Sequence, residues 1–259
     1  MRPESMRLRQ IAMMAHKIAP VQAALETVFG LKVAYRDPGV EYFGLANIVM
    51  PVGGEFLEVL EPIRDDASGA RYLSRRGGDA GYMVITQAAD ALEHRARLEA
   101  EGVRIIARSR GDAYRYTHFH PGDCAGVLLS IDSVEGDNAW QEPLSDWPPA
   151  SREWRDFPSE VSLGIASTTI QHRDPAAAAA RFAHLLAVPL TEDRGAPAVA
   201  LSPGVIRFVP PVDADGTGVV GLDIRVRDVA AVLEAARKAG LSVTDDAVSI
   251  GGVSIRAVG

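Results

Sequence analysis

The chain has 259 residues, of which 47% are apolar and 24% are charged, so it is long enough for two domains with apolar cores. Its formal net charge of −7 argues against a nucleic-acid partner, because proteins that bind nucleic acids present a basic face. No apolar run approaches the roughly 18 residues that cross a bilayer, and the polar first residues lack the apolar core of a secretion signal. We therefore expect a cytoplasmic protein without a membrane partner. The single cysteine, Cys124, excludes an internal disulfide framework and is expected to be a small, partly buried side chain.

Two copies of one structural unit are predicted in the first half of the chain. Each begins with a strand, continues with a helix in which apolar residues recur three and four positions apart, and ends with several strands. The first copy is predicted as a strand at 8–14, a helix at 20–29 and strands at 32–36, 44–50 and 55–60. The second is predicted as a strand at 81–86, a helix at 90–101 and strands at 103–107, 114–120 and 126–131.

Residues 135–158 interrupt this pattern with prolines and all three tryptophans, Trp140, Trp147 and Trp154. We interpret the segment as a connector whose aromatic rings pack onto a domain surface; a functional tryptophan cage is the alternative. The pattern then resumes. A third copy is predicted as a strand at 163–172, a helix at 175–187 and strands at 198–201 and 205–209, and a fourth as a strand at 218–226, a helix at 228–239 and strands at 242–244, 248–250 and 253–258.

Four repeats of this spacing predict an α+β fold of two tandem domains, each made of two βαβββ modules. The first domain is expected at 6–134 and contains the candidate site. The second, at 159–259, is expected to be a degenerate copy. Monomer and homodimer both stay open, because four modules in one chain can satisfy the pairing that shorter chains achieve as dimers.

Three segments resemble a known family: the run 70–78 before a strand, the strand–turn–strand sequence 51–62, and the turn 120–123 followed by the strand 126–129. Together they are similar to the vicinal oxygen chelate (glyoxalase-like) superfamily, and the first half is most similar to methylmalonyl-CoA epimerase. The resemblance implies that paired modules form an eight-stranded cup around a small-molecule ligand. It covers nearly the whole chain, as two tandem glyoxalase-like domains.

The family's chemistry uses a divalent metal ion held by one residue on the first and one on the last strand of each module. Carried onto this chain, the ligand positions fall at Gln10, Glu58, Met83 and Ser130. A thioether does not suit a hard cation, and Ser130 stands where the family has an acidic ligand. The position of the epimerase's base falls on Asn47, which cannot take a proton. We therefore expect a degenerate metal site and no cofactor.

Two histidines leave a metal-dependent alternative open. His118 and His120 lie two residues apart on a predicted strand, so their side chains face the same way. They either complete a divalent-metal site with Gln10 and Glu58 or serve as acid and base. In the alternative interpretation, His120 only orders the turn before Pro121 and His118 is partly exposed.

Arginines outside these positions have two interpretations each. Arg71, Arg75 and Arg76 either bind an anionic substrate near the first cup or form a solvated helix face. Arg207 and Arg256 fall at metal-ligand positions of the second half, where they would repel a cation. They either bind an anion as guanidinium forks or pair with neighbouring carboxylates.

Three functions follow. The first is a lyase- or isomerase-type enzyme, without the usual metal, acting on a small oxygen-rich or carbonyl compound in the first-domain cup. Glu58 is then the predicted base, because burial raises the pKa of a carboxylate. The second is a non-catalytic protein that binds or sequesters a small molecule, and the third is a metal enzyme with altered ligands. The predicted catalytic residues are Glu58, His118 and His120, and the predicted substrate-binding residues are Gln10, Asn47, Tyr82, Met83, Ser130, Arg71 and Arg75.

Overall fold

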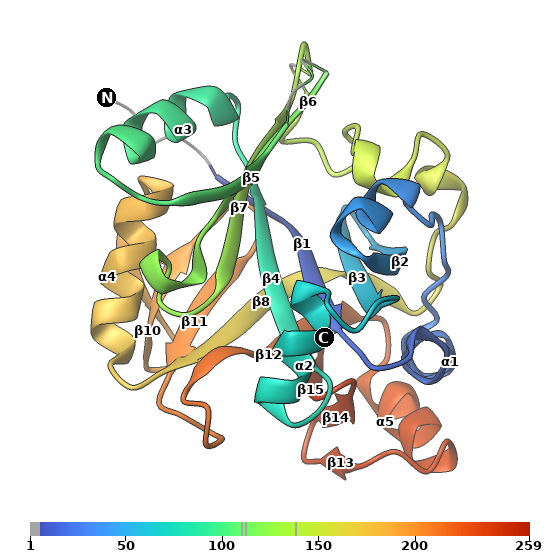
Figure 1. The fold of residues 1–259 in the computed structure, drawn as a ribbon. Coiled ribbons are helices and arrows are strands. Elements are labelled where there is room, and N and C mark those ends of the chain that lie inside the picture. The colour runs from blue at the N-terminus through green and yellow to red at the C-terminus, as the bar shows by residue number, and fades with distance from the viewer. Residues whose placement is uncertain (1–5, 110, 112, 138) are drawn as a thin grey trace. The chain divides into compact units, whose positions relative to one another are not determined.

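The computed structural model describes residues 6–109, 111, 113–137 and 139–259 (Figure 1). Its strands form two mixed sheets, and the chain divides into two compact units. Unit 1 comprises the described residues of Met1–Gln10 together with Tyr82–Pro148 and Ser167–Val219, whereas unit 2 comprises Ile11–Gly81, Pro149–Ala166 and Val220–Gly259. Each unit therefore draws on both halves of the sequence. No helix among the described residues is long and apolar enough to cross a bilayer.

Unit 1 contains two runs of neighbouring strands, β4-β7-β6-β5 and β8-β11-β10-β9. Helix α3 covers β6 and β7, and α4 covers β10 and β11 (Figure 1). Its elements are β4 (Ala80–Gln87), α3 (Ala91–Ala100), β5 (Ile105–Arg108), β6 (Tyr114–Phe119), the 3-10 helix η2 (Pro121–Asp123), β7 (Leu128–Val134), β8 (Ser162–His172), α4 (Pro175–Leu186), β9 (Leu190–Asp193), β10 (Ala196–Ala200) and β11 (Val205–Val209).

Unit 2 contains the strand runs β2-β3 and β13-β14-β15-β12, with α1 packed against α5 and α2 against β3. Strands β1, β4, β8 and β12 have residues in both units. The remaining elements are β1 (Arg7–Met14), α1 (Ile18–Phe29), η1 (Pro38–Phe43), β2 (Leu45–Val52), β3 (Glu55–Pro62), α2 (Ser68–Arg76), η3 (Pro148–Ala150), η4 (Trp154–Asp156), β12 (Thr217–Val226), α5 (Val229–Lys238), β13 (Val243–Thr244), β14 (Ala247–Ile250) and β15 (Val253–Val258).

Local sequence signals set the ends of these elements. The side chains of Asp90, Asp174 and Asp228 accept hydrogen bonds from backbone N–H groups in the first turns of α3, α4 and α5, which satisfies donors that a helix leaves free. The turn between β14 and β15 needs Gly252, which has φ +72°. A Cβ there would lie 1.7 Å from the Asp79 carbonyl oxygen, so only glycine fits.

The structure differs from the sequence predictions at two places, residues 32–36 and strand β9. Residues 32–36 form no strand, because only Tyr35 bridges to Val49 before Pro38 begins η1. The run 70–78 lies mostly in α2, which fits the helix-face interpretation of its arginines; Gly69 and Leu73 form the buried side of this helix. Strand β9 escaped prediction because its side chains are largely exposed and lack the alternation of apolar residues.

Candidate active site

Strand alternation places a row of polar side chains on one face of β6 and β7. Ser130 and Asp132 lie two residues apart on β7, opposite His118 and Tyr116 on antiparallel β6. The other face meets α3, where the Ser133 hydroxyl accepts a hydrogen bond from the Ala91 N–H. The polar row therefore lies on the face away from α3. We call it the Asp132 face; it consists of Gln87, Tyr114, Tyr116, His118, Ser130 and Asp132.

The Asp132 carboxylate is the centre of this face. It is fully buried, and it accepts hydrogen bonds from the Tyr114 hydroxyl at 2.5 Å and from the Ser130 hydroxyl. Burial raises the pKa of Asp132 to about 7, against the opposing effect of these bonds and of one from the Thr117 backbone. A carboxyl group with such a pKa exchanges its proton near neutral pH, as a general acid or base requires.

His118 lies beside Asp132 on the same face, as the register partner of Ser130. Its ring is 4.8 Å from the ring of Tyr116, measured between centroids. The side chain keeps some accessible surface, but burial lowers the pKa of His118 to about 4. The imidazole is therefore neutral at pH 7, with one N–H donor and one acceptor nitrogen.

His120 plays a different part from His118. It lies just past the end of β6, and its Nδ1 accepts a hydrogen bond from the Gly122 N–H at 3.0 Å. That bond caps η2 and orders the turn. Asp123 in this turn is held by Arg104, whose guanidinium donates to both carboxylate oxygens at 2.8 Å and lowers the pKa of Asp123.

The four predicted metal-ligand positions have other partners or unsuitable chemistry. In unit 1, the Gln10 Oε1 accepts a 2.7 Å hydrogen bond from the Trp147 indole N–H, Ser130 donates to Asp132, and Met83 is buried. In unit 2, the Asn47 amide donates to Glu58 Oε1 at 2.6 Å.

A hard divalent cation does not fit these donors. The Asn47 carbonyl oxygen is also engaged, since it accepts from the Asp37 N–H at 2.8 Å. Within the ranges that the structure describes, no three His, Cys, Asp or Glu side chains gather to hold a metal ion. Divalent ions of this kind prefer oxygen and imidazole ligands. Met83 offers only a thioether, and the Gln10 amide and the Ser130 hydroxyl are already engaged in hydrogen bonds. We therefore derive no step through a metal.

The remaining predicted binding residues lie on α2 and at the start of β4. Tyr82 is half-buried. Arg71 is exposed and donates to the Asp66 carbonyl, and the Arg75 guanidinium lies 5.3 Å from the centre of the Tyr72 ring. Arg76 is half-buried.

The two arginines of the second half form ion pairs. Arg207 is buried and donates to the Asp193 carboxylate at 2.7 Å and to Thr169 Oγ1 at 3.0 Å. Arg256 lies 3.3 Å from the Asp246 carboxylate. Because both guanidinium groups are already neutralised by a carboxylate, the structure fits the interpretation that they pair with neighbouring carboxylates better than the interpretation that they bind an anion.

The connector packs as predicted. Trp147 and Trp154 are almost fully buried. In unit 1, the Trp147 ring meets the Tyr114 ring edge to face, with 5.5 Å between centroids.

Cys124 is buried, and burial raises the pKa of its thiol to about 12, so it is no nucleophile.

Sequence reasoning missed Asp132, Tyr114 and Gln87. The predicted strand ended at residue 131, one residue short of Asp132, whereas β7 continues to Val134. Alternation continued along the longer strand places Asp132 on the same face as Ser130. Gln87 ends β4 and is in register with Asp132 on parallel β7. That pairing has no local sequence signal, because it joins residues 45 positions apart.

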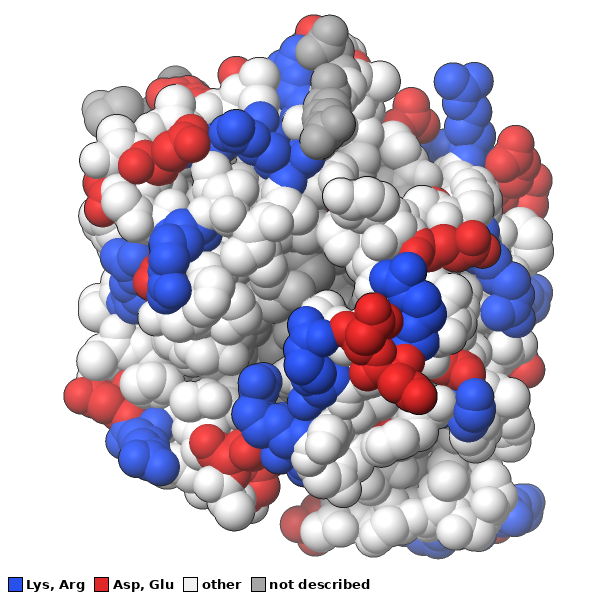
Figure 2. Space-filling model, in the orientation of Figure 1, with Lys and Arg blue, Asp and Glu red and all other residues white. Residues whose placement is uncertain are grey.

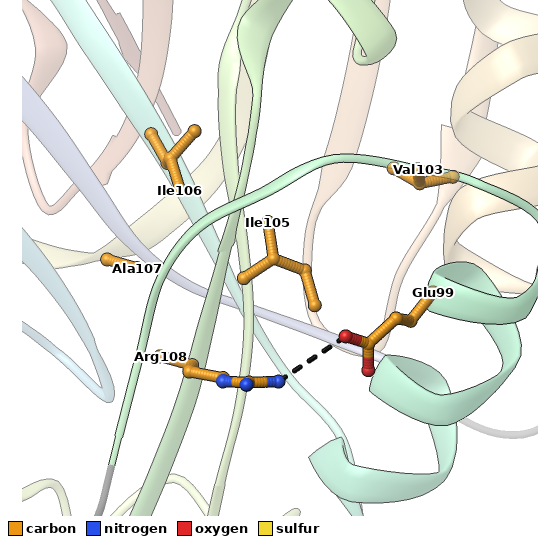
Figure 3. A pocket seen from close by; sticks show the side chains of 6 residues that line it. All are labelled: Glu99, Val103, Ile105, Ile106, Ala107 and Arg108. Atoms are coloured by element: carbon orange, nitrogen blue, oxygen red, sulfur yellow. Dashed lines mark hydrogen bonds and ion pairs between the residues drawn. The ribbon is translucent and has the colours of Figure 1, made fainter.

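Other surface features do not offer comparable chemistry. A recess of about 290 Å³ between α3 and β5 is lined by aliphatic side chains, and an Arg108–Glu99 ion pair of 3.4 Å crosses it (Figure 3). The one carboxylate that lines this recess is paired with the one guanidinium that lines it. On the face shown in Figure 2, acidic and basic side chains are interspersed.

Comparisons with known proteins identify the fold. Neither the protein-family models nor the curated proteins gave a match. Among solved structures, a variant of 4-hydroxymandelate synthase from Streptomyces coelicolor matches 93% of this chain and 76% of its own, with a TM-score of 0.68 and 14% identity. Methylmalonyl-CoA epimerase from Streptomyces coelicolor, in complex with 2-nitronate-propionyl-CoA, matches 51% of this chain and 99% of its own, with a TM-score of 0.46 and 23% identity. The Mycobacterium tuberculosis epimerase matches 49% of this chain and 87% of its own, with a TM-score of 0.45 and 20% identity.

The chain therefore shares its two-domain fold with this synthase over 93% of its length. The predicted α+β class is confirmed. At 14% identity the match shows the fold alone and leaves the reaction of this chain open.

Proposed function

We propose that the protein is a lyase- or isomerase-type enzyme that moves a proton on a small carbonyl compound, with Asp132 as the acid–base group. One observation carries the proposal: a fully buried carboxylate is held by two hydroxyl groups beside a neutral histidine. Such a carboxylate is costly to bury for stability alone. Perturbed carboxylates of this kind are concentrated at sites of proton transfer.

The proposed reaction uses the residues of the Asp132 face. The ionised carboxylate of Asp132 removes a proton from the carbon next to the carbonyl, and the electron pair of that C–H bond forms an enolate. The neutral His118 ring donates its N–H to the enolate oxygen, which lowers the energy of the developing charge. The protonated Asp132 then returns a proton to the same carbon, which restores the carbonyl group. With a pKa of about 7, both forms of Asp132 are populated at neutral pH.

Glu58 is the alternative base, as the sequence predicted. It lies in unit 2, where its Oε1 accepts the Asn47 amide at 2.6 Å. A second candidate function is non-catalytic binding of a small molecule. The Trp147–Gln10 hydrogen bond favours it, because a predicted site residue is occupied by the connector.

Deuterium exchange measured by NMR tests the proposal. The wild type, incubated in D₂O with hydroxyacetone, pyruvate or propionyl-CoA, is expected to exchange the hydrogens next to the carbonyl of at least one compound. Asp132→Asn keeps the shape of the side chain and is expected to lower that rate by at least about 100-fold. Glu101→Gln is the matched control, since this carboxylate pairs with His184 away from the Asp132 face.

Three outcomes separate the alternatives. Loss of exchange in Glu58→Gln with normal exchange in Asp132→Asn assigns the base to Glu58. Binding of a compound without exchange in the wild type favours the non-catalytic function. Equal exchange in the wild type and in both carboxylate variants contradicts the proposed chemistry.

A further inference from the structure

Gln87 is a buried amide without a partner. It ends β4 and is 0% exposed. Among the described residues, neither its Oε1 nor its Nε2 has a hydrogen-bond partner. An amide removed from water without replacement bonds costs free energy of folding, so native proteins keep few of them.

Two other buried glutamines of unit 1 show the usual arrangement. Gln171 accepts from the Val212 N–H at 2.7 Å and donates to Asp213 Oδ1 at 2.6 Å. Gln10 accepts from Trp147. Gln87 therefore differs from these two buried glutamines, and a ligand that supplies the missing bonds would account for the difference.

The position of Gln87 connects it to the proposed site. Gln87 and Asp132 are register partners in the parallel pair β4–β7, and the Ala88 N–H donates to the Asp132 carbonyl at 2.9 Å. Cα partners in a parallel ladder have side chains on the same face. The amide of Gln87 therefore lies on the Asp132 face, next to the carboxylate.

We propose that Gln87 binds the substrate of the Asp132 site, and that this substrate is a small uncharged compound with a hydroxyl or N–H group beside its carbonyl. The inference rests on the proposed function and adds the substrate class. The amide Nε2 donates to the carbonyl oxygen and the Oε1 accepts from the adjacent hydroxyl or N–H, so one side chain satisfies both groups.

The charges around the site favour an uncharged ligand. An anion would be repelled by the Asp132 carboxylate, and the neutral His118 offers no compensating charge. The positive charge of Arg95 has only a minor lowering effect on the pKa of Asp132, and its guanidinium donates to Thr117 Oγ1 at 2.7 Å and to the Tyr116 carbonyl at 2.8 Å. Because Thr117 lies on the α3 side of β6, the guanidinium is not directed toward the Asp132 face.

The test compares stability with equilibrium binding in one variant. Gln87→Leu removes the unpartnered amide, so its Tm is expected to equal that of the wild type or exceed it by about 2–4 °C. Its affinity for the probe hydroxyacetone, measured by calorimetry or ligand-observed NMR, is expected to fall at least about tenfold, which is the loss of one such hydrogen-bonded pair. Gln171→Leu is the matched control: it breaks satisfied bonds, so its Tm falls while binding stays unchanged. Gln87→Met serves if the leucine variant does not fold.

The ligand class is tested with wild-type protein and three further probes. Acetone lacks the hydroxyl, and lactate and pyruvate are anions. Hydroxyacetone is expected to bind at least about tenfold more tightly than each of them. Equal or tighter binding of the anions, no binding of hydroxyacetone, or a fall in Tm in Gln87→Leu like that in Gln171→Leu overturns the inference.

These measurements are independent of turnover. Binding that depends on Gln87, without deuterium exchange, would refute the proposed function and leave Gln87 as a residue that binds a ligand of this class without turnover. Deuterium exchange that depends on Asp132 but is unchanged in Gln87→Leu would support the proposed function and refute the role of Gln87 in binding.

Discussion

The Tyr114 hydroxyl donates a 2.5 Å hydrogen bond to the Asp132 carboxylate, and this bond opposes what burial does to the same group. Burial raises the pKa of Asp132, whereas bonds from Ser130 and Tyr114 lower it, and the balance is a pKa of about 7. Single substitutions that remove one of these hydrogen-bond donors should therefore shift the pKa of Asp132.

Tyr114→Phe is expected to raise the pKa of Asp132, because it removes a donor that stabilises the charged carboxylate. In the proposed reaction the base must be ionised, so the rising limb of the pH–rate profile for deuterium exchange should move to higher pH. Tyr35→Phe, in unit 2, is the control for loss of a phenolic hydroxyl elsewhere. An unchanged profile in Tyr114→Phe would mean that the bond does not hold in solution.

Asp132 is expected to make the protein less stable as the pH rises from about 4 to about 7. Its folded pKa of about 7 lies above its ordinary value of 3.8, so in this window the unfolded carboxyl has lost its proton while the folded one keeps it. The free energy of unfolding of the wild type should therefore fall, relative to Asp132→Asn, by up to about 1.4 kcal/mol per pH unit. Urea unfolding at several pH values measures the difference. A difference between the two proteins that does not change with pH would contradict the raised pKa.

His118 is expected to act in the opposite direction. Its folded pKa of about 4 lies below its ordinary value of 6.5, so the unfolded chain takes up a proton that the folded chain does not. The wild type should lose stability relative to His118→Gln as the pH falls from about 6.5 to about 4. The same urea series measures this. Equal pH dependence in the two proteins would show that the imidazole is solvated.

Cys124 is expected to resist alkylation in the folded protein. Burial raises the pKa of its thiol to about 12, so very little thiolate exists at pH 8. Because it is the only cysteine in the chain, mass spectrometry after iodoacetamide treatment reports on this site alone. The protein in 8 M urea, an ordinary unfolding concentration, should be labelled fully and serves as the control. Rapid labelling of the folded protein would mean that the turn opens.

Purification without chelator is expected to yield protein with far less than one equivalent of divalent metal. The physical reason is the donor set: Gln10 and Glu58 oxygens already accept hydrogen bonds, and Met83 is a thioether. Elemental analysis by mass spectrometry measures the content. Near-stoichiometric metal that disappears in Glu58→Ala would contradict this expectation and make the histidines ligands.

Much of the fold was predictable because it depends on short-range patterns. Alternation predicted β8 and β12, and apolar spacing with aspartate caps predicted α4 and α5 to within two residues at each end. The same patterns failed at residues 32–36, where the hydrogen bonds to β2 are confined to Val49, which bridges to Tyr35 and accepts from the Ala34 N–H. A strand needs a neighbour as well as a pattern, and the neighbour is a tertiary feature.

The sequence by itself determined that four similar modules would form an α+β protein, and that Asn47, Met83 and Ser130 depart from the chemistry of the family it resembles. Only the tertiary structure decided that Asp132 is fully buried, that Tyr114 reaches it across the β6–β7 pair, and that Gln87 arrives beside it without a partner. The physical reason is that the energy of a charge or an amide depends on its surroundings, and strands distant in sequence supply those surroundings.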